Sequence, residues 1–417
     1  MPAADGGLHL LFISVHGLIR GQNLELGRDA DTGGQTRYVV ELARALGAHP
    51  QIARVDLLTR RVLDSSVSAD YARHEEMLSD TARIIRLDCG EDAYLPKEHL
   101  WDCLDVFADN ALHWLCEHEL TPDIVHSHYA DAGYVGIRLS SQLGVPLVHT
   151  GHSLGRVKRR RLLARGLKRD VIEARYNMSR RVEVEEDILG TAELVITSTN
   201  QEIEQQYGLY DHYQPEKMRV IPPGTELDNF YPPDGNERNS QIYRELGRFL
   251  LNPDRPVVLA LSRPDTRKNI TTLLESYGES EALQAAANLV VVAGNRDDIR
   301  DIDSEAQQVL TDILLTIDQY DLYGRVAYPK SHRPEDVPVL YRLAAASQGV
   351  FINPALTEPF GLTLIEAAAS ALPIIATEDG GPRDIIHNCH NGLLIDPLDP
   401  EDIASAVKQI LQDKQGW

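Results

Sequence analysis

Leu8-His-Leu-Leu-Phe-Ile-Ser-Val15 is followed by a long loop, which ends in Asp31-Thr-Gly-Gly-Gln35, and then by an amphipathic run over residues 36–46. A short apolar run is typical of a buried parallel strand, and apolar residues recurring near every 3.6 positions are typical of a helix. The stretch therefore predicts a strand and a helix joined at the carboxyl end of the strand, the repeating unit of a doubly wound α/β sheet.

The same alternation continues along the first half of the chain. Short apolar runs predict further strands at residues 55–59, 84–87, 124–126, 145–150 and 194–198. Longer amphipathic runs between them predict helices, among them residues 101–118 and 170–189.

The alternation stops at Val220-Ile-Pro-Pro-Gly224 and in the Pro-, Asn- and Asp-rich stretch 228–239, which is poor in strand and helix formers. It resumes with predicted strands at 257–261, 289–294, 350–353 and 373–377 and helices at 270–276 and 334–346. We expect two Rossmann-like, doubly wound parallel-sheet domains, 1–228 and 229–417, facing a central cleft. Ligands of such sheets bind beyond the carboxyl ends of the strands, so we expect the chemistry in that cleft.

Net charge excludes two classes of partner. The 417 residues carry 41 Lys and Arg against 63 Asp and Glu, a formal charge of −22, which repels nucleic acid and anionic membranes. The apolar run at residues 8–15 is too short for a membrane span or a signal sequence, so we expect a cytoplasmic protein. The four cysteines show no ligand spacing, which favours reduced thiols over a zinc site. No cofactor is expected, and Mg²⁺ stimulation has no signature in the sequence.

Two strand-end motifs suit phosphate. Gly33 and Gly34 stand at a predicted helix start, where free backbone N–H groups and the helix dipole favour an anion. Arg263 and Lys268 leave one loop after the strand at 257–261, where together they can neutralise a diphosphate leaving group. A plain hinge loop or a solvated basic loop would explain either motif taken alone.

A third motif pairs two carboxylates around a helix start. Glu358 and Glu366 flank Gly361, which is expected to open a helix after the strand at 350–353. Carboxylates accept hydrogen bonds from the hydroxyl groups of a sugar and of a ribose. The alternative interpretation is one glutamate that complements the dipole at the helix N-terminus and one glutamate on the helix surface.

A basic segment interrupts the acidic chain. Eight of the 14 residues from 156 to 169 are Lys or Arg, and we keep Lys158, with Arg180 and Arg181 downstream, as candidate phosphate ligands. At a screening length of about 8 Å the local cluster decides what a small anion experiences.

Histidines lie at two other predicted strand ends. His152 follows the strand at 145–150 and can hydrogen-bond a sugar hydroxyl, although a lone histidine is more often a satisfied polar residue. His126 and His128 are expected on one strand face without a further ligand, so a hydrogen-bonding role in the cleft is favoured for His128 over a metal site.

Together these motifs resemble the retaining family 4 glycosyltransferases of the GT-B fold. More narrowly the sequence is similar to the sucrose-phosphate synthases through Ser14-Val-His-Gly-Leu-Ile-Arg-Gly21, Leu26-Gly-Arg-Asp-Ala-Asp-Thr-Gly-Gly-Gln35, His128-Tyr-Ala-Asp-Ala-Gly133, Thr150-Gly-His-Ser-Leu-Gly155 and Val326-Ala-Tyr-Pro-Lys330. The likeness covers roughly residues 8–400. It implies transfer of glucose from UDP-glucose, or another NDP-glucose, to the 2-hydroxyl of fructose 6-phosphate with retention of configuration, giving sucrose 6-phosphate. A sucrose-phosphate phosphatase would be the pathway partner.

The resemblance also assigns roles to residues. It implies an acceptor-binding first domain and a nucleotide-sugar-binding second domain. For the donor it implies Gly33 and Gly34 at the diphosphate and sugar, Arg263 and Lys268 at the diphosphate, Glu366 at the ribose, and Glu358 and His152 at the glucose. The donor-binding residues also include His128 and the backbone of Phe360, Gly361, Leu362 and Thr363. For the acceptor it implies Gly34 and Gln35, with Lys158 and Arg180 on its phosphate. His152, Arg263, Lys268 and Glu358 would be the catalytic set. No general base is named, because in the front-face mechanism proposed for the family a donor phosphate oxygen takes the acceptor's proton.

Alternatives stay open. A sucrose synthase would use free fructose, against which Lys158 and Arg180 argue. A nucleotide-sugar 2-epimerase would need acid and base residues that we cannot identify, and a non-catalytic nucleotide-sugar-binding protein would use the same residues without turnover. Family members commonly continue past the last motif, some with a regulatory arm and a phosphatase-like domain, which we expect this chain, ending at Trp417, to lack. The run Arg159-Arg160-Arg161 is more basic than the family pattern.

Overall fold

The fold is described from a computed structural model. The structure describes residues 7–25, 28–29, 31–164, 166–224 and 227–413. The chain separates into two compact units, Met1–Ile221 and Pro222–Trp417. Along the chain, the division between them falls in the proline-rich stretch in which the sequence analysis placed a boundary, a few residues before position 228.

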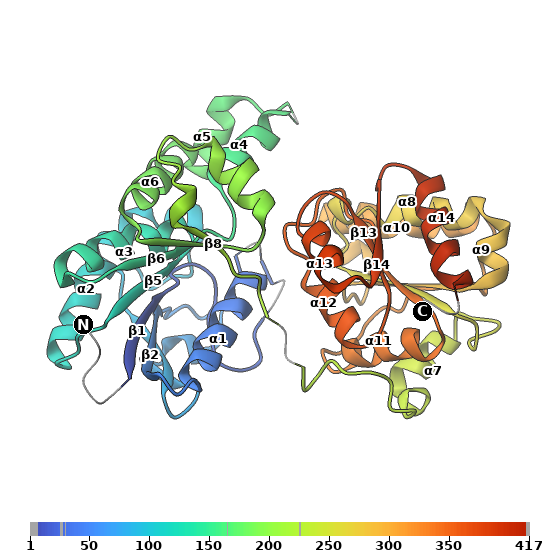
Figure 1. Ribbon diagram of the computed structural model, residues 1–417, viewed down its shortest axis with the longest axis horizontal. Helices are drawn as coiled ribbons and strands as arrows, with labels where there is room; N and C mark the ends of the chain where they lie inside the picture. The colour runs from blue at the N-terminus through green and yellow to red at the C-terminus, as the bar shows by residue number, and fades with distance from the viewer. Residues whose placement is uncertain (1–6, 26–27, 30, 165, 225–226, 414–417) are drawn as a thin grey trace. The chain divides into compact units, whose positions relative to one another are not determined.

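Among the described residues, the first unit holds an eight-stranded sheet in the order β3-β4-β2-β1-β5-β6-β7-β8 (Figure 1). β3 pairs antiparallel with β4, and the other neighbours pair in parallel. The strands are β1 (Leu8–Ile13), β2 (Ile52–Arg60), β3 (Glu75–Met77), β4 (Ala82–Leu87), β5 (Ile124–His128), β6 (Leu147–Thr150), β7 (Leu194–Thr197) and β8 (Met218–Val220).

Helices cover both faces of this sheet because alternate residues of each strand point to opposite sides. Leu10 and Phe12 of β1 pack with α1, whereas Leu11 and Ile13 pack into the cluster that contains α2, α3 and α6. The helices are α1 (Gly34–Gly47), α2 (Leu104–Glu117), α3 (Ala130–Leu143), α4 (Gly155–Ala164), α5 (Arg169–Tyr176) and α6 (Met178–Thr191). The predicted doubly wound α/β architecture is confirmed for this unit.

One local prediction for the first unit is wrong, and one short strand is missed. The single helix expected over residues 170–189 is two helices, because Asn177 adopts a left-handed backbone with φ of 46° and ends α5. β3 was not expected, since three residues reading Glu-Glu-Met carry too short and too polar a signal for a strand.

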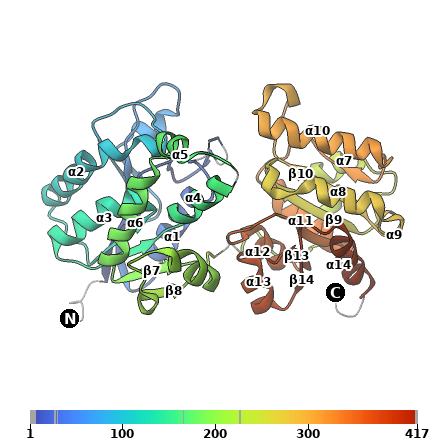
Figure 2. The ribbon, with the colours of Figure 1, turned by 90° about the horizontal axis from the view of Figure 1, so that it is seen from above.

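The second unit repeats the plan of a sheet covered by helices (Figure 2). Its six described strands pair in parallel in the order β11-β10-β9-β12-β13-β14. The strands are β9 (Val257–Ser262), β10 (Asn288–Ala293), β11 (Val326–Ala327), β12 (Val350–Asn353), β13 (Ile374–Thr377) and β14 (Gly392–Ile395). The predicted parallel α/β domain is confirmed here too.

Its helices again form two layers. One hydrophobic cluster takes in α8, α9, α10 and α14, and a second takes in α7, α11, α12 and α13. The helices are α7 (Gln241–Gly247), α8 (Ile270–Glu279), α9 (Glu281–Ala286), α10 (Ser304–Gln319), α11 (Asp336–Ala346), α12 (Leu362–Ala369), α13 (Pro382–Cys389) and α14 (Pro400–Gln412). Within the described ranges, no helix combines the length and the apolar character needed to cross a bilayer.

Strand order fixes where a ligand can bind in each unit. In the first unit β1 lies between β2 and β5, and in the second β9 lies between β10 and β12. Successive connections leave such a strand in opposite directions, which opens a crevice at its carboxyl end. The predicted site residues follow these strands or their neighbours, and the two crevices are described below in turn.

Candidate active site

The glycine loop after β1 is held open at the start of α1. Gly33 is the N-cap of α1, and a Cβ added to Gly33 or Gly34 would meet no described atom within 4 Å. The loop is anchored by Asp31, whose carboxylate accepts hydrogen bonds from the side chain and the backbone N–H of Lys97. Burial opposes ionisation of Asp31, yet the contacts with Lys97 outweigh it and lower the pKa of the carboxyl. The first backbone amides of α1 thus border open space.

Gln35 lies in the first turn of α1. Its side-chain Nε2 is buried, and none of the described residues accepts a hydrogen bond from it. A buried amide donor without an acceptor is costly, so this position favours a ligand that supplies one.

The strand-end histidines are stacked in the first unit. The rings of His126 and His128 lie 4.2 Å apart between centroids, which confirms that they share a strand face. His152, beyond β6, makes a 3.0 Å hydrogen bond to His128 and packs edge-on against Tyr38. Nowhere in the described part of the chain do three or more His, Cys, Asp or Glu side chains gather as metal ligands.

Lys158 lies in the first turn of α4, whose start is fixed by a buried carboxylate. The backbone N–H of Gly155 donates to both oxygens of Glu185, at 3.0 and 2.9 Å. Arg181 donates to the same carboxylate at 2.9 Å and is itself buried. Arg181, considered above as a phosphate ligand, is therefore engaged within the fold, whereas the half-buried Lys158 extends from a helix start that is fixed in place.

Lys158 shares its surroundings with Lys97. Each ammonium group lies 3.7 Å from Oε1 of Glu98, and Lys158 Nζ is also 4.2 Å from the centre of the Tyr176 ring. Burial lowers the pKa of Lys158 to about 8, with the positive charges of Arg181 and Lys97 acting in the same direction. Lys97 is also paired with Asp31, whereas the nearest carboxylate that the described residues bring to Lys158 is that of Glu98 at 3.7 Å. Lys158 is therefore the less compensated cation of the two, and its position favours an anion.

Arg180 reaches the same segment of chain. Its guanidinium donates to Asp102 at 3.1 Å and to the backbone oxygen of Trp101 at 3.2 Å, and it lies over the Trp101 ring. Arg180 is thus brought near the segment that carries Lys97, although a carboxylate already occupies part of its hydrogen-bonding capacity.

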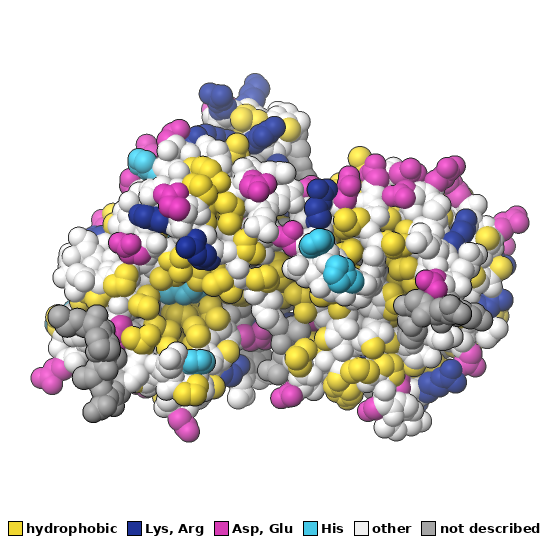
Figure 3. Space-filling model, in the orientation of Figure 1, with side chains coloured by type: hydrophobic (Ala, Val, Ile, Leu, Met, Phe, Trp, Pro, Cys, Tyr) yellow, Lys and Arg dark blue, Asp and Glu magenta, His cyan; other side chains and the backbone are white. Residues whose placement is uncertain are grey.

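Four other cations of the basic segment lie on the surface. Lys and Arg side chains gather over α4 and α5 in Figure 3. Arg160, Arg161, Lys168 and Arg169 are exposed, and no ion pair joins them to any residue that the structure describes. They are separate from the half-buried Lys158.

In the second unit, Lys268 and Glu358 form an ion pair between the ends of β9 and β12. Lys268 Nζ lies 2.6 Å from Oε2 of Glu358, and the side chain of Asn353 donates to the same oxygen at 3.0 Å. Glu358 is buried. A buried carboxylate thus fixes the position of the lysine at the strand crossover.

The loops that carry this pair are tied together by backbone groups. Asn269 ends the Lys268 loop with φ of 55° and donates from its amide to the carbonyl oxygens of Pro354 and Pro397. The N–H of Leu356 donates to the carbonyl of Arg267 at 2.8 Å. Arg263, at the start of the loop, is exposed.

Gly361 opens α12 with φ of 97°, as predicted, and α12 then begins at Leu362. The preceding backbone is approached closely by the turn after β13: a Cβ on Gly380 would collide with the carbonyl of Glu358, and one on Gly381 with Phe360. The backbone amides of Gly361, Leu362 and Thr363 therefore lie at the start of α12, a position that favours anion binding. The turn at Gly380 and Gly381 packs closely against the backbone just before this helix start. This Gly-Gly turn follows a strand and was not singled out from the sequence.

Glu366 lies one turn into α12 and is buried rather than on the helix surface. Tyr341 of α11 donates its hydroxyl to Oε2 of Glu366 at 3.2 Å. The carboxylate is thus oriented by a neighbouring helix that the sequence did not associate with it.

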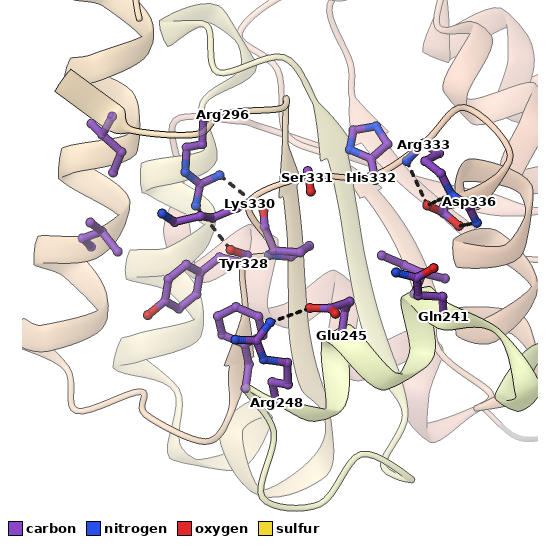
Figure 4. A pocket seen from close by; sticks show the side chains of 15 residues that line it. Gln241, Glu245, Arg248, Arg296, Tyr328, Lys330, Ser331, His332, Arg333 and Asp336 are labelled. Carbon is purple, nitrogen blue, oxygen red and sulfur yellow. Dashed lines mark hydrogen bonds and ion pairs between the residues drawn. The ribbon is translucent and has the colours of Figure 1, made fainter. Parts of the chain in front are cut away.

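A pocket of about 660 Å³ lies beside the carboxyl ends of β10 and β11, on the same edge of the sheet as the end of β9 (Figure 4). Arg296 holds its rim by donating to the backbone oxygens of Tyr328 and Pro329, each at 3.3 Å, and Lys330 donates to the carbonyl of Asp297. Burial lowers the pKa of Arg296. Tyr328, Pro329 and Lys330 of the motif Val326–Lys330 therefore line the cavity. Its other charged lining residues are Arg248, Arg296, Arg333, Glu245 and Asp336.

Residues 33–224 match the family described as glycosyl transferase 4-like domain, and residues 244–416 match glycosyl transferases group 1. A solved sucrose-phosphate synthase from Thermosynechococcus elongatus is 30% identical, with a TM-score of 0.72 over 97% of this chain and 90% of its own. The chain belongs to the sucrose-phosphate synthase family. The resemblance identified from the motifs is thus confirmed, and so is the predicted pair of Rossmann-like domains of the GT-B fold.

Curated members of the sucrose-phosphate synthase family are more similar in sequence. Sucrose-phosphate synthase 4 of Arabidopsis thaliana is 46% identical over 98% of this chain, and the match covers 45% of that relative. The chain thus spans about half the length of the curated relatives it matches. A structure of Anabaena HepE in complex with UDP-glucose is 16% identical with a TM-score of 0.62 over 98% of this chain and 91% of its own, a likeness that concerns the fold alone.

Proposed function

We propose that this protein transfers glucose from UDP-glucose, or another nucleoside diphosphate glucose, to the 2-hydroxyl of fructose 6-phosphate with retention of configuration. The observation that carries the proposal is the pair of half-buried lysines, Lys97 and Lys158, around one oxygen of Glu98. Lys97 is paired with Asp31, so the less compensated cation is Lys158, 3.7 Å from Glu98. A phosphorylated acceptor gives a reason for such a half-buried cation, and free fructose does not.

The first unit would hold the acceptor. Lys158 and Lys97 bind the phosphate, with Arg180 at its border, while the free amide of Gln35 and the first N–H groups of α1 at Gly34 meet its oxygens. The open space beside Gly33 and Gly34 supports this placement.

The second unit would hold the donor. Lys268 and Arg263 bind the diphosphate, Glu358 and Glu366 accept hydrogen bonds from glucose and ribose hydroxyls, and the amides of residues 360–363 cradle the phosphate oxygens. The pocket beside Arg296 lies on the same edge and has room for the nucleoside.

In the reaction the glucose C1–O bond to the diphosphate breaks as the acceptor 2-oxygen bonds to C1 on the same face. The acceptor's proton passes to an oxygen of the departing diphosphate. Lys268 stabilises the negative charge that builds on that group, so positioning and electrostatics supply the acceleration without a protein nucleophile. The product is a phosphate ester, and a sucrose-phosphate phosphatase is the partner that would consume it.

The test is to incubate the purified protein with UDP-glucose and either fructose 6-phosphate or fructose, and to measure UDP and the disaccharide. We expect UDP and sucrose 6-phosphate at least tenfold faster with the phosphorylated acceptor. Equal rates with fructose would assign a sucrose synthase, and donor binding by calorimetry without turnover would assign a binding protein.

A further inference from the structure

His152 is held in one orientation by the turn after β6. Its backbone is left-handed, with φ of 56°, a conformation that costs energy for a side chain with a Cβ. A Cβ on the preceding Gly151 would collide with the hydroxyl of Tyr207. The ring packs edge-on against Tyr38 at 5.1 Å between centroids.

A second histidine, His128, is fully buried behind it and shares one hydrogen bond with it. Nδ1 of His128 lies 3.0 Å from Nε2 of His152, so one of the two nitrogens donates and the other accepts. Burial lowers the pKa of both rings, that of His152 to about 3, and neighbouring histidines act in the same direction. Both rings are therefore neutral near pH 7, and each carries a single N–H.

The other nitrogen of His128 decides which ring donates. Its Nε2 is buried, and no described residue offers it a hydrogen bond; the rings of Phe12 and His126 lie 5.3 and 4.2 Å away. A proton on Nε2 would be a buried N–H without an acceptor, which is rarer in proteins than a buried acceptor without a donor. The favoured arrangement places the proton of His128 on Nδ1, donating to His152.

That arrangement fixes the chemistry of His152. With Nε2 accepting from His128, the single proton of His152 lies on Nδ1, and Nδ1 has no hydrogen bond within the described ranges. We propose that His128 is a positioning residue that locks His152 in the Nδ1–H tautomer, so that His152 offers a hydrogen-bond donor to a hydroxyl oxygen of the transferred sugar. The sugar part rests on the proposed function, whereas the tautomer is a property of the protein alone.

The tautomer is tested without substrate, by long-range ¹H–¹⁵N correlation spectra of protein labelled at histidine, with His128→Gln and His152→Gln used to assign the rings. We expect the protonated nitrogen of His128 to be Nδ1 and that of His152 also to be Nδ1. A protonated Nε2 on His128 would overturn the proposal whether or not the protein transfers glucose.

The positioning role is tested with two matched variants. His128→Asn places an amide N–H near the position of Nδ1, whereas His128→Gln places it near that of Nε2. We expect kcat/KM for UDP-glucose to fall at least tenfold in His128→Gln and to be largely rescued in His128→Asn. In a His152→Ala background the two should become equal, since the ring they orient is gone.

The positioning role would be contradicted if His128→Asn and His128→Gln lost kcat/KM equally while both kept the wild-type melting temperature. It would also be contradicted if the two variants still differed in the His152→Ala background. If no transferase activity is found at all, the proposed function fails while the spectra still decide the tautomer.

Discussion

The positive charge of Lys268 in the second unit is closely paired with a carboxylate, whereas that of Lys158 in the first unit is not. In the second unit Lys268 is 2.6 Å from the buried carboxylate of Glu358, which also accepts from Asn353. In the first unit Lys158 lies 3.7 Å from Glu98, and burial lowers its pKa to about 8. A closely paired lysine is held at a fixed point, suited to charge that appears only during reaction, whereas an under-compensated one gains most when an anion binds.

Of the variants that test this comparison, Lys268→Ala should have the largest effect. We expect kcat to fall by about 10²- to 10³-fold, as when one preorganised donor to a developing anion is removed, with a smaller change in KM for UDP-glucose. Steady-state kinetics at saturating donor measure it. Arg267→Ala is the matched control, because Arg267 is exposed and bonds to Asp265 of its own loop.

The loss could also come from repulsion by the Glu358 carboxylate left unpaired. Lys268→Ala combined with Glu358→Gln separates the two causes. We expect no recovery of kcat in the double variant, and a return to near wild-type turnover would mean that Lys268 serves only to neutralise Glu358.

In the first unit, Lys158→Gln should act on binding of the acceptor. Loss of a charge-assisted hydrogen bond worth about 1.5–3 kcal/mol predicts a KM for fructose 6-phosphate raised about tenfold to hundredfold. The KM for UDP-glucose and the slow reaction with free fructose should not change. If the reaction with free fructose declined in parallel, Lys158 would support the fold of α4 rather than bind the phosphate.

The lowered pKa of Lys158 predicts a pH dependence of its own. Lys158 is charged below its pKa of about 8 and loses the charge as pH rises through that value. The phosphate of the acceptor, with a second pKa near 6, stays a dianion over this range. We therefore expect kcat/KM for fructose 6-phosphate to fall above about pH 8, as the free enzyme's pKa values appear in this quantity.

In Lys158→Gln this limb of the profile should disappear. Its persistence in the variant would assign the titration to another group.

The sequence predicts a site residue well when the position of that residue depends on its neighbours in the chain, and poorly when it depends on distant segments. Gly33, Lys268, Glu358 and Gly361 follow strands or open helices within a few residues, so strand-end reasoning locates them. The partner of Lys268 lies 90 residues away, and only the parallel pairing of β9 with β12 brings the two loops together.

Other parts have no local pattern. Lys97 begins a short 3₁₀ helix, Lys97–His99, away from any strand end. Its relevance appears only through its contacts with Asp31 and Glu98. Asn177 ends α5 in a left-handed conformation. Because the residue is not a glycine and the apolar periodicity continues across it, the sequence does not predict the break between α5 and α6. Such features are set by packing between distant segments rather than by neighbours in sequence.

The exposed cations of α4 offer the mildest test of the contrast. Arg160 and Arg161 are on the same helix as Lys158 but lie in solvent, and no described residue forms an ion pair with either. Surface charges of this kind contribute little, so Arg160→Gln and Arg161→Gln should change the free energy of unfolding by no more than about 0.5 kcal/mol. Their KM for fructose 6-phosphate should stay within about twofold of wild type, since a charge in solvent is screened over about 8 Å. Urea titration and initial rates measure both, and a rise in KM comparable to that of Lys158→Gln would show that burial is not what distinguishes Lys158 from its neighbours.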